Sequence, residues 1–404
     1  MFIIALIIVN FLTNTYNAVM IYYLAFFFVN STFVIINPYL QVMLDNLGFG
    51  FEAVGIFIAC FEGFGILGPL LIGHIANSKN WYKKTIIASL IISSLSFYFL
   101  SYVNSYIAVI LLLITTGFFF RAIAPLLDSI GNAAVSGDSA RYTKIRAAGT
   151  VGYVIISATL SLINRPILDS NKSIGLWLII ISFISVIIMF FVPKNDDLYV
   201  KMVKDNSNNN GNWFDKAFVI CLILIGLNRF SLSGVCSFLS LYSIKEVGYT
   251  DLTTLNLVST VAEFFVMIYS GHLLQEKKVK PVNMLIFGSL ILTIRVLIYA
   301  FLPSVKFLLL GQTLHSVCYG SFHAASIVFI NKHIRKDMSG VGISMYYALA
   351  TSLPSVISSS IGGFIISNYN FTSLFLFYGV ISMLSVLIGI IFYKTLNKEI
   401  EYSI

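Results

Sequence analysis

The sequence predicts an all-α membrane protein with twelve transmembrane helices in two pseudo-symmetric bundles of six. This prediction rests on the composition, on the length of the apolar runs and on one polar break near the middle of the chain. Of the 404 residues, 58% are hydrophobic and only 10% are charged. So few charged side chains cannot cover a soluble protein of this size, and the chain is therefore expected in a lipid bilayer.

The apolar runs have the length of membrane-spanning helices, because about 20 helical residues cross the ~30 Å of hydrocarbon. The runs are continuous and do not alternate with polar residues, which excludes a closed β-barrel. The twelve predicted spans cover residues 18–44, 52–76, 84–103, 106–132, 146–164, 174–192, 216–243, 253–274, 280–301, 305–331, 339–366 and 372–394.

The polar stretch 193–215 divides these spans into two sets. It is rich in Asn and Asp, cannot bury enough apolar surface to fold, and is typical of a flexible cytoplasmic linker. Residues 18–192 are expected to form an N-terminal six-helix bundle and residues 216–395 a C-terminal one, and 396–404 form a cytoplasmic tail.

The first 44 residues are too long for one span. As a single helix, the uncharged run before Asp45 would be ~66 Å long, about twice the hydrocarbon thickness. Residues 1–17 are therefore predicted to be an interfacial stub, an extension of the first span, or an over-long start ahead of Met20.

Lysine and arginine alternate between the loops, which predicts the orientation in the membrane. Under the positive-inside rule the basic loops are cytoplasmic, so both termini are expected inside, in a multi-pass protein of the cell membrane. The net charge of +8 then reports topology and does not indicate a nucleic-acid partner. The basic breaks contain Lys79/Lys83/Lys84, Arg141/Lys144, Lys194/Lys201/Lys204/Lys216, Lys277/Lys278/Lys280, Lys332/Arg335/Lys336 and Lys394/Lys398.

No residue pattern indicates an enzyme, a metal site or a cofactor. The four cysteines all lie in apolar segments without the spacing of a disulfide framework or a metal site, and they are interpreted as small packing residues. His315 and His323 share one helix face but have no further ligand nearby in the sequence. Nucleotide-binding and hydrolase motifs are absent from the sequence, so neither coupling to ATP nor an enzyme activity is expected.

Ionisable side chains inside the spans indicate a path for a hydrophilic solute. A charge at the centre of a spanning helix costs ~3 kcal/mol on insertion scales, so such residues usually face a polar cavity and each other. Seven residues qualify, namely Glu62, Arg121, Asp128, Arg146, Arg229, Glu263 and Arg295.

The fourth and fifth spans carry the sharpest local pattern. Arg146, Thr150 and Tyr153 are spaced i, i+4 and i+7, which places guanidinium, hydroxyl and ring on one stripe. Asp128 lies in the preceding span, seven residues after Arg121 on the same face. An acid, a forked donor and a flat ring suit a hydroxylated ring substrate, through hydrogen bonds to vicinal hydroxyls and stacking on the ring. The alternative is an Asp128–Arg146 pair that only joins two helices.

Two loops of the chain are similar to each other. Gly73-His74 follows the second span and Gly271-His272 follows the eighth, and lysines follow in each case. Internal repeats of this kind are typical of secondary transporters. Six plus six helices, a cytoplasmic linker and this repeated loop resemble the major facilitator superfamily, although Asn77 stands where that family usually has an acid.

A narrower resemblance covers the fourth and fifth spans. Pro125-x-x-Asp128, then Arg146, then the segment 149–153 (Gly-Thr-Val-Gly-Tyr) is similar to the lactose permease pattern. Phenylpropionate permeases and nucleoside proton symporters share parts of it. The resemblance implies that Asp128 and Arg146 bind substrate hydroxyls and that Tyr153 stacks on the substrate ring, with Thr150 beside them.

The second half of the chain supplies the candidates for coupling. The same resemblance implies that Glu263, Arg295 and His315 couple proton movement to transport, although the family's proton-carrying acid is Cys318 here. A buried carboxyl favours its protonated form and a nearby guanidinium favours the ionised form, so a moving Arg295 could load and release a proton on Glu263. Asn228 and Arg229 are candidate ligands for an anion, and His315 is a second candidate substrate contact.

These observations predict a secondary active transporter that takes up a small organic solute, such as a sugar or a nucleoside, together with protons. It is expected to act by alternating access and as a monomer. The sequence leaves three alternatives open: uptake of an aromatic carboxylate, favoured by four intramembrane arginines against three acids; efflux by antiport; and a receptor that binds the solute without moving it.

Overall fold

The computed structural model describes residues 17–135, 138–163, 170–193, 214–335 and 339–398. The predicted stub 1–17 except its last residue, most of the linker 193–215 and most of the tail 396–404 lie outside the described residues. Within them, the chain is helical throughout, apart from one isolated antiparallel bridge between Phe214 and Ile334.

The prediction of an all-α protein with twelve spans is confirmed. Continuous helices arise because an apolar run in lipid must satisfy its backbone hydrogen bonds within the segment. The helices long and apolar enough to cross a membrane are Met20–Asp45, Phe51–Lys79, Tyr82–Tyr102, Tyr106–Ala134, Arg141–Leu162, Asn171–Phe191, Lys216–Lys245, Leu252–Gln275, Pro281–Phe301, Val305–Lys332, Val341–Asn368 and Phe371–Ile391.

The fifth span begins earlier than expected. Helix α7 (Ser139–Ile163) includes the basic residues that the sequence analysis left in a loop before residue 146. Asp138 explains this start, because its Oδ1 accepts a hydrogen bond from the backbone N–H of Arg141 at 3.1 Å. Such a cap satisfies a free amide of the first turn, so the helix extends beyond its apolar part.

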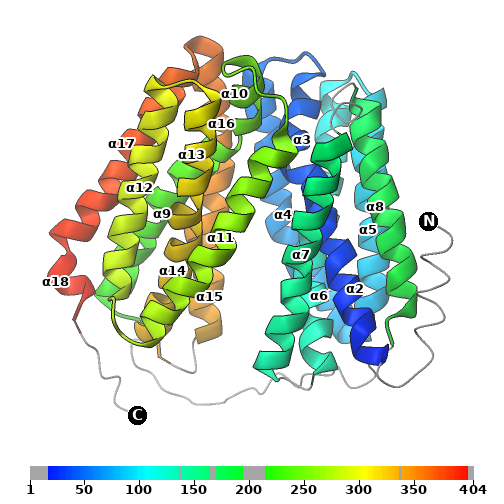
Figure 1. The fold of residues 1–404 in the computed structure, drawn as a ribbon, viewed down its shortest axis with the longest axis horizontal. Helices are drawn as coiled ribbons and strands as arrows, with labels where there is room; N and C mark the ends of the chain where they lie inside the picture. Colours follow the sequence, from blue (N-terminus) through cyan, green and yellow to red (C-terminus); the bar gives the residue numbers. More distant parts are fainter. Residues whose placement is uncertain (1–16, 136–137, 164–169, 194–213, 336–338, 399–404) are drawn as a thin grey trace. The chain divides into compact units, whose positions relative to one another are not determined.

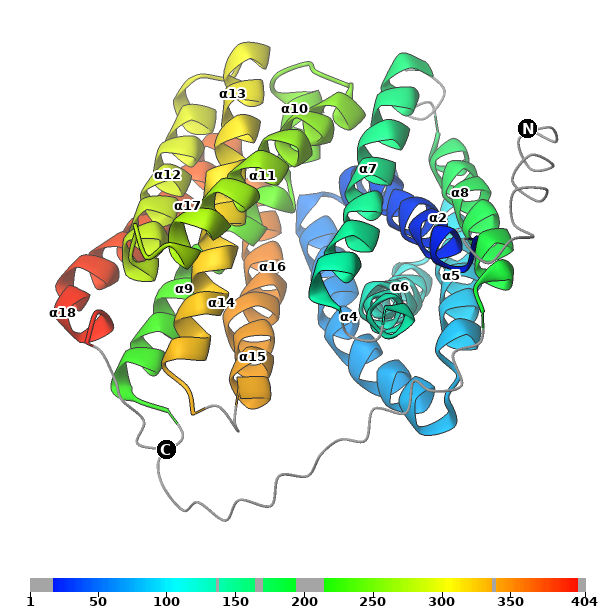
Figure 2. The same cartoon turned by 60° about the horizontal axis from the view of Figure 1, so that its bottom comes forward.

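The chain divides into two compact units, of residues 1–47 with 63–202 and of residues 48–62 with 203–404. In the first unit, α5 packs against α6 and α8, and α2 packs against α7 and α8. Figure 2 shows α6 nearly end-on, with α5 and α7 beside it. The helices in the first half of the chain are α2 (Asn17–Ser31), α3 (Phe33–Asp45), α4 (Phe51–Lys79), α5 (Tyr82–Phe99) with the turn η1 (Leu100–Tyr102), α6 (Tyr106–Ala134), α7 and α8 (Asn171–Phe191).

In the second unit, α17 packs against both α12 and α9, and α16 also packs against α9. Figure 1 shows α17 at the outer edge of this unit beside α12. Its buried centre includes Phe218, Leu285, Phe322 and Phe329. The helices in this half of the chain are α9 (Lys216–Cys236), α10 (Leu239–Lys245), α11 (Leu252–Gln275), α12 (Pro281–Phe301), α13 (Val305–His315), η2 (Ser316–Ser321), α14 (Phe322–Lys332), α15 (Ser339–Tyr347), η4 (Ala348–Ser352), α16 (Leu353–Asn368), α17 (Phe371–Ile391) and α18 (Tyr393–Leu396).

Four spans are interrupted, which the sequence analysis did not predict. The first breaks at Thr32, whose hydroxyl donates to the carbonyl of Val29 at 2.7 Å, and the seventh breaks at Ser237 and Phe238. The tenth and eleventh each contain a π-helical segment, η2 and η4. Wide turns of this kind occur often at functional sites, because they rotate the side chains that follow.

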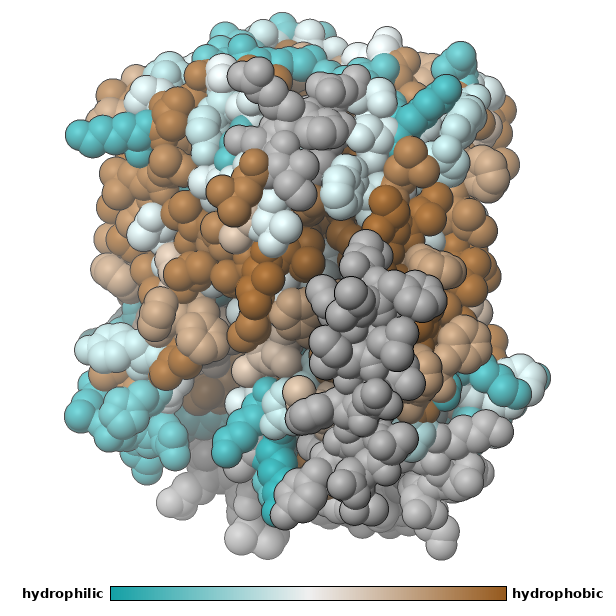
Figure 3. Space-filling model, turned by 45° about the vertical axis from the view of Figure 1, so that its right-hand side comes forward, coloured by the Kyte–Doolittle hydropathy of each residue, from teal (hydrophilic) through white to brown (hydrophobic). Residues whose placement is uncertain are grey.

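The surface of the spans is apolar where a membrane would contact it. Brown apolar side chains cover the middle of the face drawn in Figure 3, and teal hydrophilic side chains gather toward its two ends. Large exposed apolar residues such as Phe183, Phe190 and Leu111 contribute to such surfaces. An apolar surface of this extent requires lipid and not water as its solvent.

Candidate functional site

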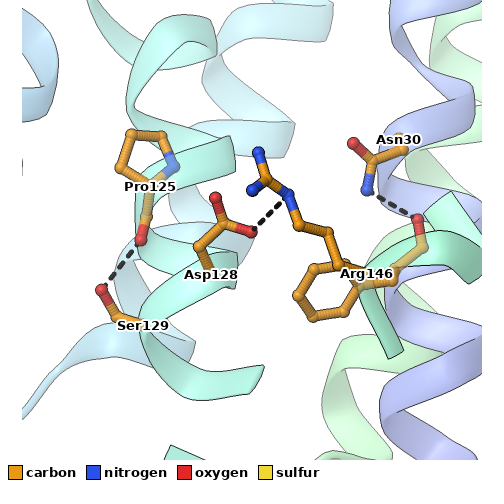
Figure 4. Close-up of polar contacts among 6 residues, drawn as sticks. Asn30, Pro125, Asp128, Ser129 and Arg146 are labelled. Atoms are coloured by element: carbon orange, nitrogen blue, oxygen red, sulfur yellow. Dashed lines mark hydrogen bonds and ion pairs between the residues drawn. The ribbon is translucent and has the colours of Figure 1, made fainter. Parts of the chain in front are cut away.

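Asp128 on α6 and Arg146 on α7 lie together in the first unit. The Arg146 Nε is 3.7 Å from the Asp128 Oδ1, and the two side chains point toward one another across the gap between their helices (Figure 4). The contact is single and long, and the side chain of Asp128 is 34% exposed and that of Arg146 is 66% exposed. Asp128 also accepts a hydrogen bond from Tyr142. A pair so exposed leaves N–H groups of Arg146 for a ligand.

The packing of α7 explains why this pair stays open. Ile145, Gly149 and Gly152 are buried on one face of the helix, whereas Arg146 is exposed and Thr150 and Tyr153 are half-buried. A Cβ on Gly149 would lie 2.6 Å from the Asn30 amide nitrogen, and one on Gly152 would lie 2.8 Å from the Phe27 carbonyl carbon, so both glycines admit α2 at close range. Asn30 itself is fixed by a 2.8 Å bond to the Phe26 carbonyl oxygen, drawn in Figure 4.

Arg295 on α12 occupies a fully buried position in the second unit. Its Nε donates to the Tyr299 hydroxyl at 3.2 Å, its Nη2 to the Gln312 Oε1 at 2.9 Å, and its Nη1 lies 3.1 Å from the His315 Nδ1. A guanidinium can only donate, so the His315 Nδ1 must be the acceptor and the ring is a neutral imidazole that carries its proton on Nε2. All three partners of Arg295 are therefore uncharged.

Arg229 on α9 is the second buried guanidinium of this unit. Its Cζ lies 4.6 Å from the centroid of the Tyr319 ring and 5.5 Å from that of Phe322, and its Nη2 donates to the Tyr346 hydroxyl at 3.4 Å. These contacts are cation–π and neutral hydrogen bonds. Within the described part of the chain, the Nε of Arg229 and the Oδ1 of the adjacent Asn228 have no hydrogen-bond partner. Buried polar atoms of this kind usually bind water or a ligand.

The π-helical segment η2 carries a stripe of three stacked rings. Tyr319 lies between His315 and His323, with centroid distances of 5.6 and 5.9 Å and interplanar angles of 18° and 11°. The His323 Nδ1 is 2.7 Å from the Tyr346 hydroxyl. The same hydroxyl oxygen accepts from Arg229, so Tyr346 links Arg229 to His323.

Glu263 on α11 lies beside this segment. A Cβ on Gly320 would be 3.2 Å from the Glu263 Cγ, so the missing side chain of Gly320 leaves room for the carboxyl group. No ion pair joins Glu263 to Arg295 among the described residues, and the bonds of Arg295 go to Tyr299, Gln312 and His315. Glu263 and Arg229 both approach η2, at the neighbouring residues Gly320 and Tyr319. The expected coupling of Glu263 with Arg295 stays a prediction.

Arg121 on α6 packs against α4. A Cβ on Gly65 would lie 2.7 Å from the Arg121 Cγ, and one on Gly68 would overlap the Phe118 backbone. These glycines therefore allow α4 and α6 to approach closely.

Sequence reasoning missed Gln312, Tyr319 and Tyr346. Gln312 and Tyr319 lie three residues before and four residues after His315, so helical spacing could have placed them on its face. No such signal exists for Tyr346, because it lies on another span and reaches His323 only through packing.

The twelve apolar helices have the arrangement of the major facilitator fold, which this chain shares with the solved structures described below. The model of the MFS_1 like family matches residues 19–377. The chain therefore belongs to the MFS_1 like family, and it is a multi-pass membrane transporter.

Relatives and solved structures agree with this assignment. The "Putative nucleoside transporter YegT" of Escherichia coli strain K12 is 21% identical over an alignment 408 residues long. The alignment covers 89% of this chain and 90% of that protein. A single-residue variant of the nucleoside transporter NupG superposes with a TM-score of 0.81 at 14% identity, over 95% of this chain and all of the other. The xylose transporter XylE of E. coli, in an inward-open conformation, gives 0.69 at 13% identity, over 96% and 98%.

Proposed function

We propose that this protein takes up a nucleoside or a similar base-bearing solute together with protons. Its proposed location is the cell membrane, with both termini in the cytoplasm, because the lysine-rich loops alternate along the chain. Uptake would proceed by alternating access of the two units, as in other transporters built from repeats.

The observation that carries this proposal is the stripe of His315, Tyr319 and His323. It supplies ring surface together with N–H and O–H groups on one helix face. A nucleobase is flat and has hydrogen-bonding groups along its edge, so it requires this combination. The unpartnered Arg229 Nε and Asn228 Oδ1 add a donor and an acceptor in the same unit.

The first unit, considered by itself, has side chains that suit a sugar. Asp128 and Arg146 are partly exposed, joined by one long contact, and next to the half-buried Thr150 and Tyr153. A carboxylate accepts from vicinal hydroxyls and a guanidinium donates to them, which suits the ribose of a nucleoside. The names of YegT and NupG support the same substrate class.

Glu263 is the proposed proton carrier. It is the only acid in the six spans from Lys216 to Ile391, and it lies beside Gly320, the neighbour of the Tyr319 ring on which Arg229 stacks. Protonation would cancel its attraction to Arg229, so loading a proton would change the field in which a ligand binds. His315 is a poorer carrier, because a proton on its Nδ1 would break its bond with Arg295.

An aromatic carboxylate is the second candidate substrate. The hydrogen bonds described for Arg295 go to neutral side chains, and Arg229 stacks on the uncharged ring of Tyr319. The second unit therefore has more buried positive charge than negative. A ligand carboxylate would compensate this excess.

A thermal-shift screen of the purified protein with nucleosides, sugars and 3-phenylpropionate tests the proposal. A nucleoside at about 100 times its Kd is expected to stabilise the protein by ~2.7 kcal/mol. Tyr319→Leu should abolish this shift, whereas Tyr269→Leu, at a position 65% exposed on α11, should retain it. A shift with phenylpropionate alone would select the second candidate, and stabilisation by none of these classes would contradict both.

A further inference from the structure

The turn between α4 and α5 is a fixed platform for one tryptophan. Asn80 adopts a positive φ of 51°, the Trp81 N–H donates to the Ala76 carbonyl at 2.9 Å, and the Asn80 N–H lies 3.4 Å from the Asn77 carbonyl oxygen. This pattern is a Schellman turn, which ends a helix with defined geometry. Helix α5 begins at the next residue, so Trp81 is held between two helices and not on a loose loop.

Two lysines, one before and one after Trp81 in the sequence, place their ammonium groups over the Trp81 ring. The ammonium of Lys79, at the end of α4, lies 4.6 Å from the centroid of the indole ring, and that of Lys84, in the first turn of α5, lies 5.1 Å from it. Both lysines are exposed, and Trp81 itself is 41% exposed. One ring thus holds two positive charges at the surface of the first unit.

These two charges have no carboxylate partner among the described residues. The sequence contains no acid between Glu62 and Asp128. Neither α5 nor the part of α4 that ends at Lys79 therefore contains a carboxylate that could pair with these lysines. Lys83 is different, because its ammonium donates to the carbonyls of Phe190 and Val192 at 2.7 Å each and so caps α8. Lys79 and Lys84 therefore have hydrogen-bonding capacity for an external anion.

The corresponding turn in the second half of the chain is a natural comparison. Between α11 and α12, Lys277 has a positive φ of 54° and the Lys278 N–H donates to the Leu273 carbonyl at 3.0 Å, which is the same kind of turn. There Lys278 stands in the place of Trp81, and Glu276 pairs with both Lys278 at 2.5 Å and His272 at 3.0 Å. The same backbone thus carries compensated charge in one repeat and uncompensated charge in the other.

We propose that the α4–α5 turn binds the anionic phosphodiester headgroup of a membrane lipid through Lys79 and Lys84. The Trp81 indole marks the level of the membrane–water interface, where Trp is enriched. Basic side chains beside a spanning helix attract anionic lipids, and the proposed cytoplasmic position of this loop places it at the leaflet that is rich in them. This site is separate from the transport path and does not depend on the substrate.

Native mass spectrometry of the full-length protein in detergent with added lipid tests the proposal. The wild-type protein should retain phosphatidylglycerol in preference to phosphatidylcholine. K79Q/K84Q should weaken phosphatidylglycerol binding roughly 25-fold, about fivefold for each lysine. The matched control K277Q/K278Q should change it less than about twofold, because Glu276 already compensates that turn.

Three outcomes would overturn the proposal. Undiminished phosphatidylglycerol binding by K79Q/K84Q would show that these lysines do not bind the headgroup. An equal loss in K277Q/K278Q would show that total charge, and not this turn, attracts the lipid. Displacement of the lipid by inorganic phosphate at equal concentration would show a simple anion site. Since both lysines are exposed, unchanged thermal unfolding of the variants would confirm that the protein remains folded.

Discussion

Arg295 donates a hydrogen bond from Nη1 to the Nδ1 of His315, at 3.1 Å and in the buried interior of the second unit. Because a guanidinium is always a donor, this one distance fixes the tautomer of His315. It also gives His315 a supporting role, as one of three neutral groups that hold a buried charge.

His315→Ala is predicted to destabilise the protein by about 1–3 kcal/mol, because it leaves a buried donor of Arg295 unsatisfied. The measurement is thermal unfolding of the purified protein. His272→Ala is the control, since His272 is 58% exposed and pairs with Glu276 at the surface, where such pairs contribute at most about 1 kcal/mol. Equal stability of both variants would contradict a supporting role for His315.

Asp128→Asn and Arg146→Ala are each predicted to reduce substrate affinity by about 10- to 150-fold, the usual effect of losing a charged hydrogen bond. Stability should change by at most about 1 kcal/mol, because the pair is exposed and loosely joined. Binding and thermal unfolding are measured on the same preparations.

Arg141→Ala is the matched control for this pair. Arg141 lies near the start of the same helix and pairs with Asp138 at 3.3 Å, but at 77% exposure. It should bind substrate as the wild-type protein does. If Asp128→Asn and Arg146→Ala kept their affinity and lost stability instead, the pair would be a helix-joining contact.

Glu263→Gln is predicted to abolish substrate-driven proton uptake while exchange of labelled substrate continues, because Gln keeps the shape of the side chain but carries no titratable proton. Proteoliposomes with a pH dye inside measure the first activity and counterflow measures the second. Glu276→Gln, a surface acid paired with Lys278, should leave both unchanged. Persistent proton uptake in Glu263→Gln would assign coupling to another group.

Gly152→Ala is predicted to destabilise the first unit by about 1–3 kcal/mol, since the added methyl group would meet the Phe27 backbone, which cannot move aside as a side chain can. Gly73→Ala on α4, where nothing lies within 4 Å of the added Cβ, should be neutral or slightly stabilising. Thermal unfolding of the two variants checks this. Equal stability would show that α2 and α7 do not pack as closely as described.

Much of the fold could be predicted because membrane insertion is a local property. A run of about 20 apolar residues forms a helix in lipid whatever its neighbours are, so all twelve spans were placed from the sequence. The breaks at Thr32 and in η2 could not be predicted. They depend on a hydroxyl that competes for a backbone carbonyl and on packing that favours a wider turn.

The candidate site divides in the same way. Asp128 and Arg146 could be expected to meet because they lie on consecutive spans joined by a short loop. In the second unit, Arg295 hydrogen-bonds Gln312 and His315, whereas Glu263 lies beside Gly320 of η2. Residues on different spans meet according to the rotation of each helix about its axis, which apolar runs alone do not specify.

By itself, the sequence determined that this protein is a helical membrane transporter and which polar side chains lie inside the membrane, because hydrophobicity and charge are carried by each segment alone. Only the tertiary structure decided which of those side chains are partners. That choice depends on close approaches such as Gly152 to Phe27, and on hydrogen bonds such as Arg295 to His315, which form only when separate helices pack together.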